Sequence, residues 1–173
     1  MRRLTAALIA TLMAAAMPTA LAHGSAQDAR GHLAANLEPV EKPFGRTGDP
    51  KRVTRTIHID GHDTMRFAPA EITVRQGQTV RFVVRNTGRA MHELVLGTME
   101  QLQQHAEWMR RFPNMEHEEP YMVHLAPGQT GEVIWQFSEP GEFHFGCLVA
   151  GHFDAGMKGR IIVLPRPAPA KAR

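Results

Sequence analysis

The residues with the clearest chemical potential lie near the C-terminal end of the chain, in the stretch CLVAGHFDAGM. This stretch contains Cys147, His152 and Met157, and a further histidine, His92, lies far upstream. A thiolate, two imidazoles and a thioether are the ligands of copper in electron-transfer sites, where two His and one Cys form a plane and Met binds weakly along the axis. These four residues therefore predict one copper ion per chain.

Cys147 is the only cysteine of the chain, so it cannot form an internal disulfide. A single cysteine is usually a small buried hydrophobic residue. Here it stands close to a histidine and a methionine, and a thiol that coordinates a metal is deprotonated and held. The combination favours metal ligation over simple packing.

The first residues have the features of a cleavable signal peptide: two arginines, an apolar run, and Ala20-x-Ala22 as the cleavage site. The apolar run is shorter than the ~20 residues that a membrane-spanning helix needs. We therefore expect residues 1–22 to be removed and the mature chain to begin at His23. The product is expected to be soluble and periplasmic, with no membrane span.

The charge balance gives no sign of a nucleic-acid partner. The chain has 20 Lys and Arg against 17 Asp and Glu, a formal net charge of +3. Two of the basic residues, Arg2 and Arg3, belong to the expected leader. A nucleic-acid-binding protein would carry a clustered basic face, so we expect no nucleic acid among the partners.

Composition divides the remaining chain into three parts. Residues 23–52, rich in Ala, Gly, Pro and charge, are expected to form an extended N-terminal arm, and residues 166–173 a Pro/Ala-rich tail. Residues 53–165 contain short alternating segments separated by turn signals, which is typical of an all-β, two-sheet Greek-key sandwich. The expected strands are 55–59, 71–74, 79–84, 92–96, 131–137, 141–147 and 159–164.

One segment departs from this β pattern and predicts an inserted helix over about 99–111. Thr98 and Gln101 have the spacing of a capping box. Apolar residues then recur at helical intervals, and Pro113 follows the last of them. The apolar stripe of this helix is expected to pack on the sandwich.

Four segments, FAPAEITVRQGQTVRFVVRNTG, MHELVLG, APGQTGEVIWQF and GEFHFGCLVAGHFDAGMKGRIIVL, resemble the cupredoxins, the single-domain blue-copper proteins such as plastocyanin, azurin and rusticyanin. Together they span about 54–164. The motif C-x₄-H-x₄-M is specific to the family and resembles the longer ligand loops of rusticyanin-like members. The resemblance implies that His92, Cys147 and His152 are the equatorial ligands of a type-1 copper and Met157 the axial one.

The resemblance also implies where a partner docks. In the family, a redox partner approaches an apolar patch around the second ligand histidine. A redox protein or a copper-handling partner is therefore expected near His152, whose neighbours Leu148, Val149, Ala150 and Phe153 are apolar. For Phe153, packing of the loop against the sandwich is an equal alternative.

Two positions depart from the family pattern. Glu93 follows the first histidine, where many cupredoxins carry an Asn or Ser that braces the copper loop. Ala150-Gly151 precedes the second histidine, where many have Pro-Gly. Hydrogen bonds behind the ligands tune the metal, so both positions bear on the colour and the potential of the site.

Histidine and methionine are frequent, with ten of each in the chain. Both bind copper, so the inserted region is a candidate for a second, weaker copper site, unless its methionines simply fill gaps in the core. On the arm, the free α-amino group and imidazole of His23, beside His32, are a candidate Cu(II) site, unless cleavage leaves a histidine there by chance. The residues concerned in the inserted region are Met99, His105, Met109, Met115, His117, Met122 and His124.

Three functions compete. The complete four-ligand set favours an exported type-1 copper protein that carries single electrons. The additional His and Met residues favour a periplasmic protein of copper tolerance or homeostasis that binds, oxidises or buffers copper. The third function is that of a multicopper oxidase or nitrite reductase fragment, which needs further histidines, commonly His-x-His pairs, and a second domain. The chain has no His-x-His and room for one sandwich, so we do not expect an enzyme.

Overall fold

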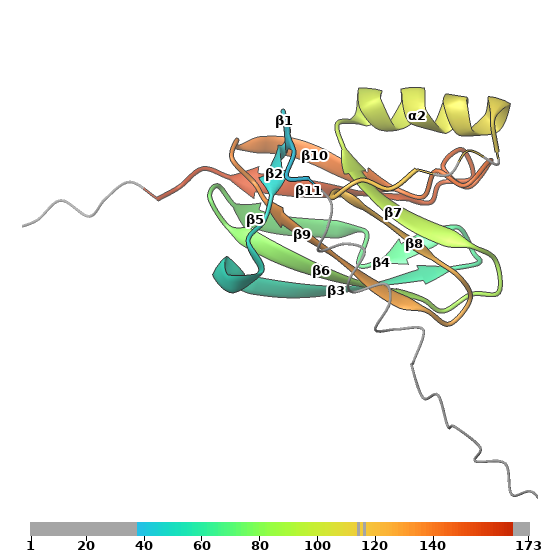
Figure 1. Ribbon diagram of the computed structural model, residues 1–173, viewed down its shortest axis with the longest axis horizontal. Coiled ribbons are helices and arrows are strands. Elements are labelled where there is room, and N and C mark those ends of the chain that lie inside the picture. The colour runs from blue at the N-terminus through green and yellow to red at the C-terminus, as the bar shows by residue number, and fades with distance from the viewer. Residues whose placement is uncertain (1–37, 114, 116, 168–173) are drawn as a thin grey trace, which may run out of the picture.

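The computed structural model describes residues 38–113, 115 and 117–167, which form two packed β-sheets with one α-helix outside them (Figure 1). The expected signal peptide and the first part of the expected arm lie outside the described residues, as does most of the expected tail. Within the described part, no helix combines the length and the apolar character needed to cross a membrane.

The strands are divided between a six-stranded and a five-stranded sheet. The first has the order β1 (Glu41–Lys42), β2 (Gly45–Thr47), β9 (Thr130–Gln136), β6 (Thr79–Asn86), β3 (Arg55–His62), β4 (Arg66–Ala68). The second has the order β5 (Glu71–Arg75), β11 (Lys158–Leu164), β10 (Gly141–Gly146), β7 (His92–Gly97), β8 (Met122–Leu125). Only the pairs β3–β6 and β5–β11 are parallel among those described. The predicted two-sheet sandwich with one inserted helix is confirmed.

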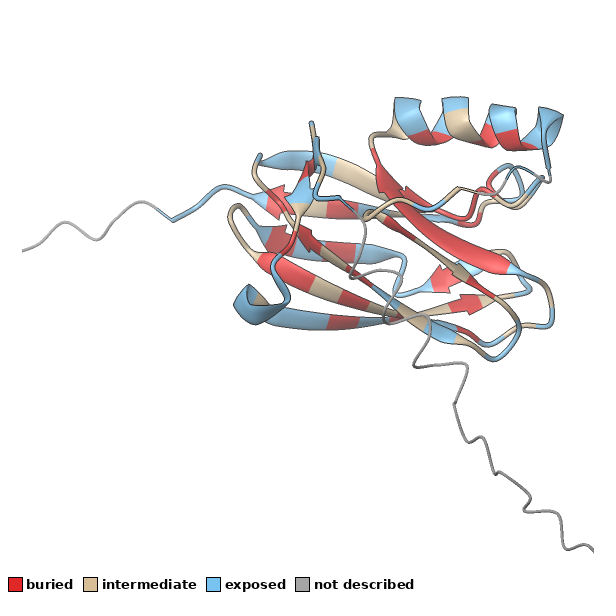
Figure 2. Ribbon diagram, in the orientation of Figure 1, coloured by how far each residue is buried: buried red, intermediate tan, exposed pale blue. Residues whose placement is uncertain are grey.

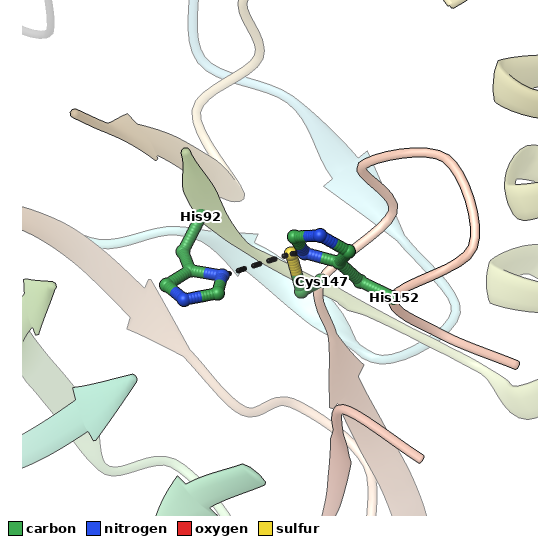
Figure 3. A group of neighbouring side chains, drawn as sticks. All are labelled: His92, Cys147 and His152. Carbon is green, nitrogen blue, oxygen red and sulfur yellow. Dashed lines mark hydrogen bonds between the residues drawn. The ribbon is translucent and has the colours of Figure 1, made fainter. Parts of the chain in front are cut away.

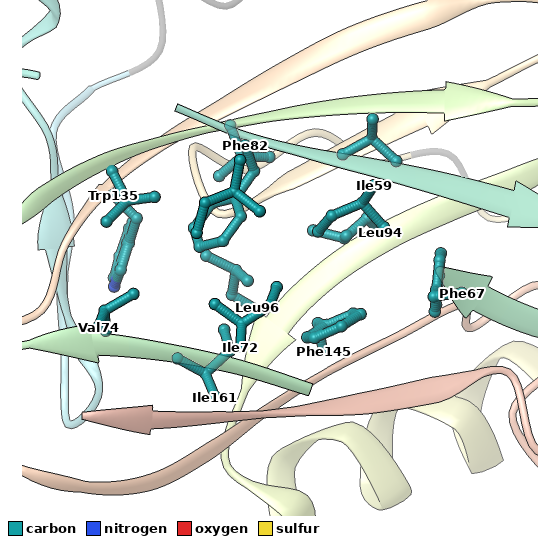
Figure 4. Close-up of a cluster of buried hydrophobic side chains, with 14 of the residues drawn as sticks. Ile59, Phe67, Ile72, Val74, Phe82, Leu94, Leu96, Trp135, Phe145 and Ile161 are labelled. Carbon is teal, nitrogen blue, oxygen red and sulfur yellow. The ribbon is translucent and has the colours of Figure 1, made fainter. Parts of the chain in front are cut away.

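Alternation of apolar residues brings the two sheets together. In β6, Val80, Phe82 and Val84 are buried, while the residues between them are more exposed, because successive side chains of a strand point to opposite faces (Figure 2). Trp135 of β9 and Phe145 of β10 fill the layer between the sheets and are fully buried (Figure 4). This layer is the main core and supports the strands that carry the site.

Strand β7 differs from the others because all six of its residues are buried. Leu94 and Leu96 belong to the core between the sheets, whereas Val95 packs in a second cluster with helix α2 (Met99–Arg111). A strand covered on both faces has no solvent-facing set of side chains. Since His92 begins β7, the first predicted ligand stands on one of the most enclosed strands of the fold.

Helix α2 has the bounds that the sequence predicts. The hydroxyl of Thr98 accepts the backbone N–H of Gln101, and the Gln101 side chain accepts the backbone N–H of Thr98, which completes the capping box. Leu102, Ala106 and Met109 form its buried face, and burial of the leucine alone is worth about 1.5–3 kcal/mol. The cluster beneath the helix includes Val95, Leu148 and Phe153.

The second half of the expected arm is part of the first sheet. Residues 41–52 form β1, β2 and a 3-10 helix, η1 (Pro50–Arg52). Phe44 is buried and stacks on Trp135 with ring centroids 5.1 Å apart, and the indole N–H donates to the Phe44 carbonyl at 3.1 Å. At Gly45, where φ is +134°, a Cβ would lie 2.2 Å from the Gln136 carbonyl oxygen. Glycine is therefore required for this close approach.

Candidate metal centre

Three of the four predicted ligands meet at one end of the sandwich (Figure 3). His92 begins β7, Cys147 follows β10, and His152 lies on the loop that joins β10 to β11. The Cys147 sulfur lies 3.3 Å from Nδ1 of His152 and 4.0 Å from Nδ1 of His92. These donor atoms all lie within 4.8 Å of one another, and no other group of His, Cys or acidic residues in the described ranges is gathered so closely.

The sulfur of Cys147 occupies a buried position with hydrogen-bond donors around it. Burial raises the pKa of this thiol to about 12, while a hydrogen bond from the backbone N–H of Glu93, with nitrogen 3.4 Å from Sγ, acts in the opposite direction. A free thiol in this position keeps its proton. A metal ion bound by this sulfur would displace that proton, and the neighbouring N–H groups would then stabilise the thiolate.

Asp63 holds the ring of His92. Its Oδ1 lies 3.0 Å from Nε2 of His92, while Nδ1 of the same ring faces Cys147. The backbone N–H groups of Arg89 and Ala90 also donate to this carboxylate, and they are the main reason why the pKa of Asp63 lies below its usual value. A carboxylate on one ring nitrogen keeps the proton there and leaves the other nitrogen free to bind a metal.

His152 is half-buried, and the loop around it is tied by its own main chain. Burial, followed by repulsion from His92, lowers the pKa of His152, which favours the neutral imidazole that metals bind. The His152 N–H donates to the Val149 carbonyl at 2.9 Å, and the Met157 N–H donates to the His152 carbonyl at 3.0 Å. Gly156, with φ of +103°, allows the turn between them.

Met157 is fully buried in the same apolar cluster as Cys147. Its carbonyl accepts the N–H of Cys147 at 3.0 Å, so its main chain lies beside the cysteine. A Cβ added at Gly61 would lie 3.2 Å from the Met157 methyl carbon, which places the thioether against β3. The axial role that the family resemblance implies for Met157 stays a prediction.

Glu93, one of the two departures from the family pattern, is a buried carboxylate with two partners. Its Oε1 accepts the backbone N–H of Leu148 at 2.7 Å, and its Oε2 lies 3.0 Å from Nδ1 of His124. The hydrogen bond to Glu93 is the main cause of a raised pKa of His124. Glu93 thus fastens the residue that follows Cys147.

The apolar neighbours of His152 divide into two groups. Leu148 and Phe153 are buried under α2, so the packing alternative for Phe153 is confirmed. Val149 is half-buried and Ala150 is exposed. Of the four apolar neighbours of His152, only Val149 and Ala150 therefore contribute to the exposed apolar surface beside it.

A second group of histidines lies beside α2. The ring of His117 is 4.6 Å from that of His105 and 5.9 Å from that of His124, measured between centroids. Nε2 of His124 also bonds to the His117 carbonyl at 2.9 Å. A cavity of about 490 Å³ adjoins the cluster, and His105, His117, Met109 and Met115 are among its lining residues. Burial, then repulsion from His117, lowers the pKa of His105.

In comparisons with known proteins, the chain matches copper-binding proteins. The family of copper binding proteins described as plastocyanin/azurin matches residues 53–164. A copper-resistant cuproprotein CopI of Rubrivivax gelatinosus is 49% identical over 141 residues, which is 82% of each chain. The protein of the same name from Vibrio cholerae is 33% identical over 107 residues, 61% of this chain and 63% of that one.

The fold is similar to that of solved blue-copper proteins. The structure of reduced auracyanin from Roseiflexus castenholzii superposes with a TM-score of 0.57 at 22% identity. The match covers 65% of this chain and 99% of the auracyanin chain. At this identity the likeness concerns the fold.

Proposed function

Because the chain belongs to the plastocyanin/azurin family of copper-binding proteins, we propose that His92, Cys147 and His152 bind copper as a type-1 site, with Met157 as the axial ligand. The observation that carries this proposal is the convergence of two imidazole Nδ1 atoms on one buried sulfur. The donor set fits the metal, since thiolate suits Cu(I) and imidazole suits both oxidation states.

Bound copper supplies a one-electron change between Cu(II) and Cu(I). The chain supplies fixed donors for both states. Asp63 orients His92, Glu93 donates its N–H to Cys147, and the loop main chain holds Met157 beside the cysteine. Because these donors are buried or hydrogen-bonded, they would need little rearrangement between the two oxidation states. The half-buried ring of His152 offers the route for the electron to and from the surface.

We assign this copper chemistry to copper tolerance in the periplasm. The related proteins from Rubrivivax gelatinosus and Vibrio cholerae are both named copper-resistant cuproproteins. Export rests on the leader features of residues 1–22, which lie outside the described residues. In this role the protein binds copper or buffers it.

The histidines beside α2 support a collecting role for the same protein. His105 and His117 line a cavity that is also lined by Met109 and Met115, and the ring of His124 lies next to that of His117. Such soft and borderline donors suit a second, weaker copper site. Replacing His105 and His117 together with alanine is expected to remove a weakly bound copper equivalent without changing the visible band of the main site. Unchanged copper stoichiometry would remove the second site from the proposal.

Single-electron transfer to another protein is the second candidate function. The specific observation in its favour is that His152 is half-buried while the neighbouring Ala150 is exposed. A redox partner or a copper-handling protein can approach the ring edge there. Measuring electron exchange with small redox mediators, with and without bulky substitution at Ala150, tests this route.

The decisive test uses Cys147→Ser. The copper-loaded wild type is expected to show a strong visible band from thiolate-to-Cu(II) charge transfer, and the variant to lose it, because a hydroxyl cannot supply the soft sulfur ligand. In a deletion strain, the wild-type gene should restore growth in copper and the Cys147→Ser gene should not. A coloured variant would end the type-1 assignment. Full restoration of growth in copper by the variant gene would show that copper tolerance does not depend on this site.

A further inference from the structure

Glu93 places a carboxylate, with 1% of its surface exposed, beside the loop that carries the thiolate. On the copper site proposed above, we infer that Glu93 is a positioning residue whose charge, balanced by His124, sets the reduction potential of the site. The family position usually holds a neutral side chain. An acid here adds a charge that a neutral amide or hydroxyl lacks.

Glu93 makes two separate hydrogen bonds, one to Cys147 and one to the residue that follows it. Its main-chain N–H donates to the Cys147 sulfur at 3.4 Å, and its side-chain Oε1 accepts the N–H of Leu148, the next residue, at 2.7 Å. The short second bond joins a charged acceptor to a buried N–H, the stronger class of hydrogen bond. The first bond acts on the sulfur itself, and the second orients the peptide that follows it.

The Oε2 atom of Glu93 has a partner, His124, which makes burial of the carboxylate less unfavourable. An isolated buried carboxylate is strongly unfavourable, and a close partner that also donates a hydrogen bond offsets much of that loss. His124 faces Glu93 directly across strands β7 and β8, with Nδ1 3.0 Å from Oε2. Its other ring nitrogen is held by the His117 carbonyl at 2.9 Å. The imidazole is therefore fixed between the carboxylate and the histidine cluster beside α2.

Charge near the metal favours one oxidation state over the other. A carboxylate stabilises the more positive Cu(II) and lowers the potential, and a nearby cation acts in the opposite sense. In a buried position these effects are screened less than at the surface. Removing the carboxylate of Glu93 and removing the imidazole of His124 should therefore shift the reduction potential in opposite directions.

The chain also contains a matched control pair. Glu142 lies 3.3 Å from His144 at the other end of β10, and its side chain is 53% exposed. Glu142→Gln removes the same charge from the same kind of pair at the surface. Any effect of Glu93→Gln that Glu142→Gln does not share belongs to the buried position of Glu93 beside Cys147, rather than to loss of a negative charge from the protein as a whole.

The test compares full-length copper-loaded proteins at pH 6, where the raised pKa of His124 keeps its ring charged. We expect Glu93→Gln to raise the reduction potential with the visible band retained, His124→Gln to lower it, and Glu142→Gln to leave it unchanged. Glu93→Ala should in addition alter the band, because Leu148 loses its acceptor. In metal-free protein, the Leu148 amide proton should resonate far downfield, and Glu93→Gln should move it upfield.

Equal potentials for Glu93→Gln and Glu142→Gln would overturn the inference, as would a shift of the same sign in His124→Gln. A Leu148 amide signal that does not respond to Glu93→Gln would overturn the positioning role. If Glu93→Ala fails to fold, the Gln variants decide the question. Absence of a visible band in the wild type would instead refute the proposed function, while the metal-free amide measurement would still test the hold on the loop.

Discussion

Arg110 of α2 and Asp154 of the ligand loop, residues 147–157 between β10 and β11, form an ion pair, with Nη1 2.5 Å from Oδ2. The same helix buries Leu148 and Phe153, which lie on that loop as well. The inserted helix therefore contacts the loop through both its apolar face and its charged edge. This contact connects a region that is peripheral to the sandwich with the segment that carries His152.

Breaking this ion pair should loosen the loop without unfolding the protein. Arg110→Ala is expected to lower the free energy of unfolding by about 1 kcal/mol or less, because both side chains are exposed. Hydrogen exchange at the Ala155 and Gly156 amides should become faster. Arg111→Ala is the control, since Arg111 pairs with Glu107 inside the helix. Equal exchange rates in the two variants would show that the Arg110 pair does not restrain the loop.

Replacing Met157 with leucine should keep the copper and raise the reduction potential. Loss of a thioether donor disfavours Cu(II), and the axial ligand tunes the metal more than it holds it. The packing change is small, about 1.5 kcal/mol or less for such a swap. Spectroelectrochemistry measures the potential and metal analysis the copper content. Complete loss of copper would mean that Met157 does more than an axial ligand.

Removing the carboxylate of Asp63 should weaken copper binding. Asp63→Ala leaves Nε2 of His92 without its acceptor, and loss of such a partner lowers metal affinity roughly 10- to 100-fold. Asp63→Asn keeps an oxygen acceptor and should retain more of the affinity. Competition with a chelator of known affinity measures both variants. An alanine variant with wild-type affinity would show that the ring is held in place by packing alone.

The metal-free thiol should react slowly at moderate pH. Because burial raises the pKa of Cys147 to about 12, the reactive thiolate is rare at pH 8 and its fraction grows roughly tenfold per pH unit below that pKa. Alkylation by iodoacetamide should accelerate accordingly, and denatured protein should react fast at pH 8. For the same reason, copper binding should release the thiol proton and strengthen as pH rises. Rapid alkylation of the folded, metal-free protein at pH 8 would contradict this.

The burial of Phe44 predicts that residues before the family match contribute to stability. Phe44→Ala removes a ring that stacks on Trp135 and is 2% exposed. Such a truncation is expected to lower the free energy of unfolding by about 3–5 kcal/mol. Denaturant titration gives the value, and Lys51→Ala in the exposed η1 is the control. A loss below 1 kcal/mol would indicate that the arm packs only loosely.

Long elements with strong local signals could be predicted from the sequence. The helix 99–111 has a capping box and an apolar stripe, and the structure reproduces its bounds. The seven expected strands all occur, with ends that differ by no more than three residues. Strands β1, β2, β4 and β8 were missed because they have two to four residues, too few to establish alternation. Their pairing depends on strands distant in the chain.

Some residues of the site could likewise be predicted from the sequence, and others could not. The convergence of His92, Cys147 and His152 could be predicted because their types and spacing are specific to one kind of metal centre. The role of Asp63 could not, since an exposed acid 29 residues before its histidine has no local signature. Glu93 stood out as a departure, but its partner His124 is supplied by the pairing of β7 with β8. Such contacts are decided by register rather than by sequence proximity.

The ligand loop is closed at its base by the strands on either side. Gly146 is paired with Lys158 across β10 and β11, and the N–H of Cys147 donates to the Met157 carbonyl. A loop closed in this way can change length or composition without moving the strands, because the entropy of closure varies only slowly with length. The pairing of β10 with β11 thus does not depend on the length of the segment between Cys147 and Met157. A change in this segment can therefore alter the properties of the metal site while the two strands at its base keep their pairing.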